Sequence, residues 1–239
     1  AECELALLTD MDERLGRSPR TVTPDAMLER TTELGLLHED RVLTGYLTRL
    51  AAAAAHADGT EDHASTASAV PGYVSFAGHD WSSLDDLRAA HDRTVAALRD
   101  GATLVYQGVL FDGRFLGRPD FLVDDTALAR ATTTAGPPTD APAHSPLVTV
   151  VDTKLARHAR VTALLQLAAY ADQLERAGVP VAPSLRLVHG DGSVSEHPLA
   201  DVLPVYRERR ARLERVVDAH LADEGPVAWG DERFSACGR

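Results

Sequence analysis

The sequence predicts a single α/β domain, and three observations point to it. Apolar residues recur at helical spacing near both ends of the chain. Two pairs of strand-like runs are each joined by a glycine-containing turn, and a buried apolar run lies between them. At 239 residues and 44% hydrophobic content, the chain is long enough to bury a substantial core.

The first hundred residues are predicted to be mainly helical. Helices are expected over residues 2–15 and 25–50, where the second segment carries apolar residues at helical spacing. The alanine run at 51–55 and the polar stretch to about residue 70 are interpreted as a fraying helix end and a loop. A short strand at 72–77 precedes a helix from Ser83 to about Asp100, which has acidic residues in its first turn.

After Gly101 the pattern changes to strands. The runs at 103–110 and 114–123 flank Asp112-Gly113, which is a hairpin signal. Residues 124–146 lack any period and are interpreted as a loop. The remaining expected elements, in order, are a buried strand at 147–154, a helix at 161–177, a second hairpin from 185–188 and 193–197, and a long helix at 201–222.

Composition restricts the function classes. The formal charge of −12 argues against indiscriminate binding of polyanions, although it leaves room for a local basic groove. No apolar run approaches the roughly 20 residues that span a bilayer, so we expect no membrane partner. The two cysteines fit a reducing cytoplasm, which is the expected location. The chain does not begin with Met, and we expect it to be a fragment of a longer protein.

Lys154 is the one lysine among 24 basic residues, and it lies in the apolar run Val150-Val151-Asp152-Thr153-Lys154. Arginine stays protonated and presents a planar fork, whereas lysine is a compact point charge whose pKa responds to its surroundings. Because strand side chains alternate, Asp152 and Lys154 share one face and Thr153 points away. A lone lysine two residues after an aspartate indicates chemistry; chance survival of one lysine is the alternative.

Two carboxylates are expected to meet beside this lysine. Asp120 lies at the start of an apolar strand, and if that strand neighbours 147–154, Asp120 faces Asp152. Paired carboxylates repel unless one is protonated or a cation lies between them. Hard oxygen ligands suit Mg²⁺ or Mn²⁺. Gln166 and Tyr170, at i and i+4 on the next helix, share one helix face and could hold a phosphate or position the lysine.

Taken in order, Pro119-Asp120, Asp152-x-Lys154 and Gln166-x-x-x-Tyr170 resemble the motifs of the PD-(D/E)xK nucleases, and more narrowly their RecB-like branch. The motifs cover roughly residues 30–175. That branch also has a histidine metal ligand that follows a glycine by a few residues on an N-terminal helix. Gly35-Leu36-Leu37-His38 matches this pattern, so the resemblance implies that His38 is a metal ligand with Asp120 and Asp152.

The resemblance implies a restriction-endonuclease-like core, in which a mixed central sheet is flanked by helices, with a helical N-terminal segment and a long C-terminal helix. It implies one RecB-like nuclease domain over 1–239, comprising a helical part (1–100), a sheet and catalytic core (101–200) and a C-terminal helical part (201–239). The implied activity is Mg²⁺- or Mn²⁺-dependent hydrolysis of DNA phosphodiester bonds, in single strands or at ends, during repair or recombination. Lys154 would position the attacking water, and Gln166 and Tyr170 would support it.

Several RecB-like nucleases, including CRISPR-associated and helicase-linked ones, hold an iron–sulfur cluster through one cysteine before the nuclease core and three after it. Cys3 and Cys237 lie at those two places. Four thiolates are needed for such a cluster and this chain has two, so the full-length protein is expected to add the others, with a helicase-like region. Two unrelated thiols are the alternative.

The expected partner is DNA, contacted near the site by Arg118, Arg157 and Arg160. A local positive lining is therefore predicted despite the net negative charge. Two other functions stay open. The first is a non-cleaving DNA-binding module of a helicase-nuclease, and the second is a metal phosphoesterase that acts on RNA or nucleotides.

Overall fold

The computed structural model describes residues 3–20, 25–58, 70–131, 147–223 and 225–234. The chain divides into two units, Ala1–Glu29 with Pro204–Arg239, and Arg30–Leu203. The larger unit contains every residue of the expected nuclease site. The single nuclease domain expected over 1–239 stays a prediction.

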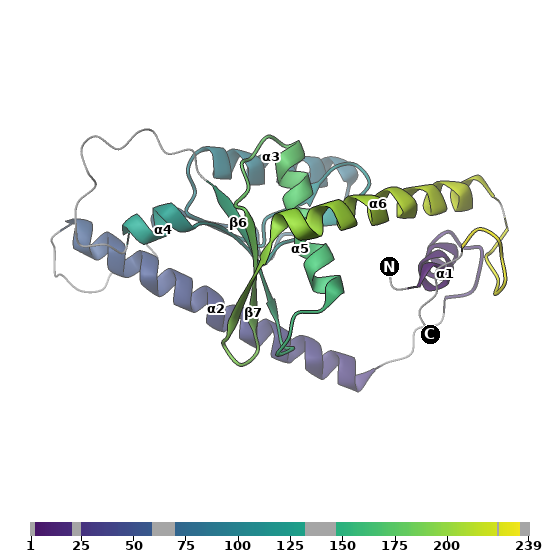
Figure 1. Ribbon diagram of the computed structural model, residues 1–239, viewed down its shortest axis with the longest axis horizontal. Coiled ribbons are helices and arrows are strands. Elements are labelled where there is room, and N and C mark those ends of the chain that lie inside the picture. The colour runs from purple at the N-terminus through teal and green to yellow at the C-terminus, as the bar shows by residue number, and fades with distance from the viewer. Residues whose placement is uncertain (1–2, 21–24, 59–69, 132–146, 224, 235–239) are drawn as a thin grey trace. The chain divides into compact units, whose positions relative to one another are not determined.

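A mixed sheet lies at the centre of the larger unit (Figure 1). Its six strands within the described residues follow the order β1 (Tyr73–Ser75), β2 (Leu104–Tyr106), β5 (Phe121–Asp124), β6 (Val148–Lys154), β7 (Ser184–His189) and β8 (Val194–Pro198). The pairs β1–β2 and β6–β7 are parallel, and the other neighbouring pairs are antiparallel. The expected α/β class with a mixed sheet is therefore confirmed.

The hairpin predicted at Asp112-Gly113 is present, but each of its arms is two strands. Strands β3 (Leu110–Phe111) and β4 (Leu116–Gly117) pair across the turn, and β2 and β5 pair further along. The side chain of Asp112 accepts hydrogen bonds from the backbone of the turn, and Gly113 has a φ of 94°. The break in the first arm lies at Gln107, whose φ of 50° is uncommon for a residue with a side chain.

The described helices are α1 (Glu4–Arg14), α2 (Ala26–Asp58), α3 (Leu84–Arg99), α4 (Asp125–Ala131), α5 (Val161–Arg176) and α6 (Leu199–Ala222). Two expectations need correction. Helix α2 continues through the alanine run to Asp58, since alanine is the best helix former. Residues 125–131 form α4 rather than a loop, because the side chain of Asp124 caps the N–H groups of Thr126 and Ala127. Residues 132–146 lie outside the described ranges.

Helices cover both faces of the sheet (Figure 1). Tyr46 and Leu50 of α2 and Leu128 of α4 pack against the face that carries Phe121 and Val151. Helices α3 and α5 contact the small β3 strand together, and α5 also contacts β6 and β7. Since side chains alternate along β6, Asp152 points away from the face that carries Val151 and towards the α5 side. No helix in the described ranges combines the length and hydrophobicity that a membrane span requires.

The smaller unit joins the two ends of the chain through buried acids. Glu4 of α1 accepts two hydrogen bonds from Arg212 of α6, at 2.6 and 3.0 Å. Asp12, which is 1% exposed, accepts from His220 at 2.8 Å and from the backbone N–H of Val227 at 2.7 Å. Burial opposes ionisation of Asp12, but these hydrogen bonds and nearby positive charges hold its pKa below the ordinary value. α1 is therefore tied to the C-terminal part of the chain.

Candidate functional site

Asp120 and Asp152 lie opposite each other on neighbouring strands. The antiparallel register pairs Phe121 with Val151, so continuing it by one residue sets Asp120 against Asp152. Asp152 points to the α5 side of the buried strand β6, and Asp120 lies at the strand end just before β5, where Thr153 also reaches it. The strand of Asp120 does neighbour the strand of Asp152, which is the condition under which the sequence predicts that the two residues face each other.

The environment of Asp120 disfavours its charged form. Burial, followed by the negative charge of Asp152, raises the pKa of Asp120 from 3.8 to about 7. The raised pKa persists even though Thr153 donates to Asp120 Oδ2 through its backbone N–H at 2.6 Å and its hydroxyl at 2.7 Å. Thr153 was expected to point away from the site. Thr153 nevertheless contacts Asp120, because Asp120 lies just before β5 and its side chain is not confined to one face of the sheet.

This pKa has a consequence for stability. A carboxyl that binds its proton more tightly in the folded state than in the unfolded chain costs stability as the pH rises from 3.8 to about 7. We therefore expect Asp120→Asn to raise the melting temperature of the metal-free protein, and to raise it more at about pH 8 than at about pH 5. Thermal unfolding in a chelator at both pH values measures this difference.

Asp92→Asn, which neutralises an exposed acid on α3, is the matched control, and its effect should not grow with pH in the same way. If Asp120→Asn changes the melting temperature by the same amount at both pH values, the raised pKa of Asp120 is contradicted.

Lys154 ends β6 with its ammonium paired to the Asp152 carboxylate. The two side chains share the α5 face of the strand, as their spacing predicts. The Lys154 side chain keeps 33% of its surface exposed, while that of Asp152 keeps 1%. Lys154 therefore connects a buried acid to solvent at the end of the strand.

Gln166 and Tyr170 of α5 are joined, since the Gln166 side-chain amide donates to the Tyr170 hydroxyl at 2.6 Å. Burial and the charge of Asp152 raise the pKa of Tyr170, so its hydroxyl stays protonated near the carboxylates. A methyl group added at Gly117 would come within 2.7 Å of the Tyr170 ring. The glycine in Gly117-Arg118-Pro119-Asp120 is thus required by close packing against α5.

The site expected from the sequence did not include Glu39 or the glutamine that contacts it, Gln107. Glu39, buried on α2, accepts a hydrogen bond of 2.7 Å from Gln107, and burial and the charge of Asp120 raise its pKa. Gln107 also accepts from Arg118 at 2.8 Å, and the Arg118 guanidinium lies 4.8 Å from the centre of the Trp81 ring. Gln107, whose φ is 50°, holds this group beside Asp120, since its backbone N–H donates to the Asp120 carbonyl at 2.9 Å. The available signal for Glu39 was its position next to His38.

His38 is buried on α2, and its Nε2 donates to the Val188 carbonyl at 3.2 Å. Among the described residues its Nδ1 is buried without a hydrogen-bond partner. Helix α2 packs on the face of Phe121 and Val151, whereas Asp152 points to the opposite face. The ligand role of His38 stays a prediction.

The donor set fits a divalent cation in part. In the described chain no three His, Cys, Asp or Glu side chains are grouped so that they could hold a metal ion, so the set of His38, Asp120 and Asp152 is not assembled. The two carboxylates do suit Mg²⁺, which commonly uses one or two carboxylates and takes its other ligands from water and substrate phosphates. Thr153 and Lys154 donate to the Oδ2 atoms of Asp120 and Asp152, respectively.

No family model, curated protein or solved structure matches this chain. The site must therefore be interpreted from its own geometry.

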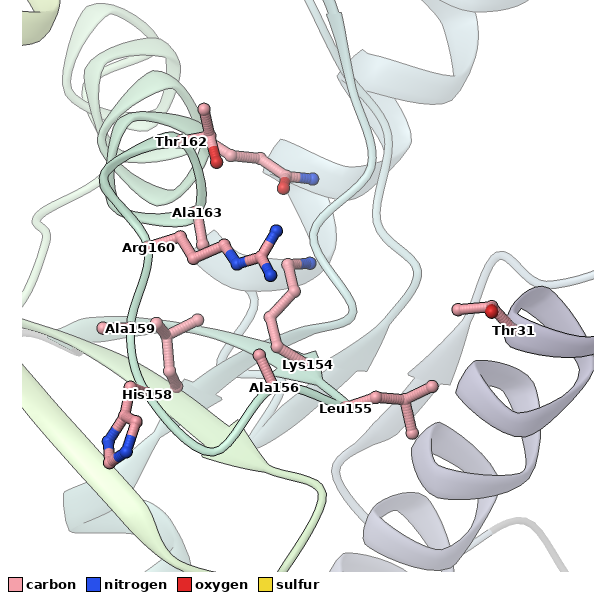
Figure 2. A pocket seen from close by; sticks show the side chains of 11 residues that line it. Thr31, Lys154, Leu155, Ala156, His158, Ala159, Arg160, Thr162 and Ala163 are labelled. Atoms are coloured by element: carbon pink, nitrogen blue, oxygen red, sulfur yellow. The ribbon is translucent and has the colours of Figure 1, made fainter. Parts of the chain in front are cut away.

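A pocket of about 510 Å³ opens beside Lys154 (Figure 2). Arg160 lines it, and the charged ends of Lys154 and Arg160 point towards one another. Arg157 is exposed and does not line this pocket, and Arg118 is held by Gln107 and Trp81 as described above. Of the three arginines expected to contact DNA, Arg160 alone is among the described residues that line this pocket, together with Lys154.

Only one of the two cysteines, Cys3, lies within the described residues. The Cys3 sulfur caps α1 by accepting from the Ala6 N–H at 3.4 Å. Cys237 lies outside the described residues. The iron–sulfur cluster stays a prediction for the full-length protein.

Proposed function

We propose that this chain is a metal-dependent deoxyribonuclease that resembles the RecB-like branch of the PD-(D/E)xK nucleases. The observation that supports it most is the geometry of one strand end: Asp120 lies opposite Asp152, and Lys154 is on the same face. An acid with a raised pKa beside a second, buried carboxylate is costly to a fold, as Asp120 is beside Asp152, and such groups cluster at functional sites.

The restriction-endonuclease-like core is part of this proposal. The antiparallel pair β5–β6 carries the acids, α5 follows β6, and β7 returns parallel to β6. This element order agrees with the motif order in the sequence. The mixed sheet flanked by helices is compatible with it.

Each residue has a role in the proposed reaction. Asp120 and Asp152 would hold Mg²⁺ or Mn²⁺, with His38 as the third predicted ligand. Such an ion lowers the pKa of a bound water and stabilises charge on a phosphoryl oxygen. Lys154 would orient the attacking water and then stabilise the developing negative charge. The protonated Tyr170 hydroxyl and Gln166 would hold the substrate backbone or Lys154 in position.

The proposal is tested by incubating end-labelled single- and double-stranded DNA, and an RNA of the same sequence, with the protein and Mn²⁺. Wild type should cleave DNA, and Asp152→Ala and Lys154→Ala should each reduce the rate by roughly a hundredfold or more. Asp92→Ala removes an exposed carboxylate on α3 and serves as the matched control. Persistent cleavage in both site variants would overturn the assignment, and preference for RNA would favour a different phosphoesterase.

A non-cleaving DNA-binding module is the second candidate. It is favoured by the absence of a three-donor group among the described residues and by the pairing of Lys154 with Asp152. Binding of DNA without cleavage, in Mg²⁺ and in Mn²⁺, would support this candidate over the nuclease.

A further inference from the structure

The pocket beside Lys154 concentrates positive charge in an acidic protein. Lys154 and Arg160 both line it, and none of the described residues that line it is acidic. The whole chain carries a formal charge of −12, so a lining with two cations and no acid differs from the chain as a whole, even with Lys154 paired to the buried Asp152 beneath it. A cavity lined by one sign of charge attracts ligands of the opposite sign.

Arg160 is available to a ligand. Within the described residues, its guanidinium makes no hydrogen bond or ion pair, and its side chain is exposed. Arg160 is also the N-cap of α5, where no side chain caps the helix and no acid lies in the first turn. Figure 2 shows its guanidinium beside the Lys154 ammonium, with Thr162 further along the same wall. Lys154 is already paired with Asp152, so Arg160 is the charge in this pocket that an anion would neutralise, with Lys154 as a second donor beside it.

The rest of the pocket wall is suited to more than a bare anion. Leu155 and three alanines line the pocket, with the buried Leu187 behind them, so an apolar surface adjoins the cationic end. The volume of about 510 Å³ falls within the usual range for small-ligand sites. A phosphate joined to a sugar and base would use both parts of this wall.

We propose that the pocket holds one nucleotide of the substrate strand, with a phosphate between Lys154 and Arg160 and the nucleoside against Leu155 and the alanines of the same wall. That the nucleotide belongs to a DNA strand rests on the proposed nuclease function. The binding of a nucleotide phosphate rests on the pocket alone, and it does not require metal or cleavage.

The test measures binding of thymidine 5′-monophosphate, inorganic phosphate and thymidine to the full chain in a chelator at constant ionic strength, by isothermal titration calorimetry. The nucleotide should bind more tightly than either phosphate or thymidine, because it contacts both parts of the wall. Equal affinity for the nucleotide and for inorganic phosphate would overturn the nucleotide assignment.

Arg160→Gln should weaken nucleotide binding by roughly tenfold, as expected for loss of one charge-assisted hydrogen bond. Arg160→Asp separates binding from folding, because aspartate is a better N-cap than arginine. It should raise the melting temperature and abolish nucleotide binding. Arg93→Gln, at an exposed arginine on α3, controls for the loss of one charge.

The two proposals fail in distinguishable ways. Nucleotide binding that is unchanged in Arg160→Asp would overturn the pocket assignment, whether or not the protein cleaves DNA. Nucleotide binding that is lost in Arg160→Asp but retained in Arg93→Gln would support it, even if the Mn²⁺ cleavage assay shows no activity.

Discussion

Replacing Lys154 with arginine is expected to reduce DNA cleavage by roughly a hundredfold or more while leaving the fold intact. Arginine stands at every other basic position of the chain, so the change looks conservative. At the end of β6, however, the ammonium is paired with the buried Asp152 carboxylate and reaches solvent from there. The guanidinium is larger, planar and less able to serve as a point charge beside a water.

The measurement is the Mn²⁺-dependent cleavage rate, with the melting temperature recorded on the same preparations. Because the Lys154 side chain is partly exposed, the arginine can extend to solvent and the melting temperature should change little. Cleavage retained by Lys154→Arg would show that Lys154 has no special chemical role, and its being the one lysine in the chain would then be chance.

Phe121→Ala is expected to lower the free energy of unfolding by about 3–5 kcal/mol. Phe121 is fully buried, and its ring centre lies 5.2 Å from that of Tyr46 on α2 and 5.5 Å from that of Tyr106 on β2. Truncation would leave a cavity where the helix and two strands meet.

Chemical denaturation monitored by circular dichroism measures this effect. Phe121→Leu, which fills much of the volume, should cost less and keep the protein folded if the alanine variant does not fold. Leu116→Ala, at a residue 51% exposed in the neighbouring hairpin, should change stability by no more than about 0.5 kcal/mol. A similar small effect for Phe121→Ala would contradict the core described here.

Long periodic segments were predictable because their apolar residues repeat at a fixed spacing. Helices α3 and α5 and strand β6 lie where that spacing places them, and the turn at Asp112-Gly113 was evident from its two residue types. Short elements were not predictable. α4 has seven residues and depends on a cap at Asp124, and the break at Gln107 depends on contacts with Glu39 and Arg118.

Within the candidate site too, some residue positions were predictable from local spacing and others were not. Strand alternation was sufficient to set Asp152 and Lys154 on one face, and helical spacing was sufficient to pair Gln166 with Tyr170. The placement of His38 was not predictable from its spacing after Gly35. It depends on which face of the sheet α2 covers, and that is decided by the packing of Tyr46 and Leu50 far along the same helix.

By itself the sequence determined the α/β class, the order of the main elements and the choice of Lys154, since composition and periodicity are properties of the chain alone. Only the tertiary structure decided that Asp120 lies opposite Asp152, that Glu39 joins the group around Gln107, and that Arg160 rather than Arg157 lines the pocket with Lys154. These are contacts between residues distant in the chain. Strand register and helix packing create them, and no local pattern of residues encodes either.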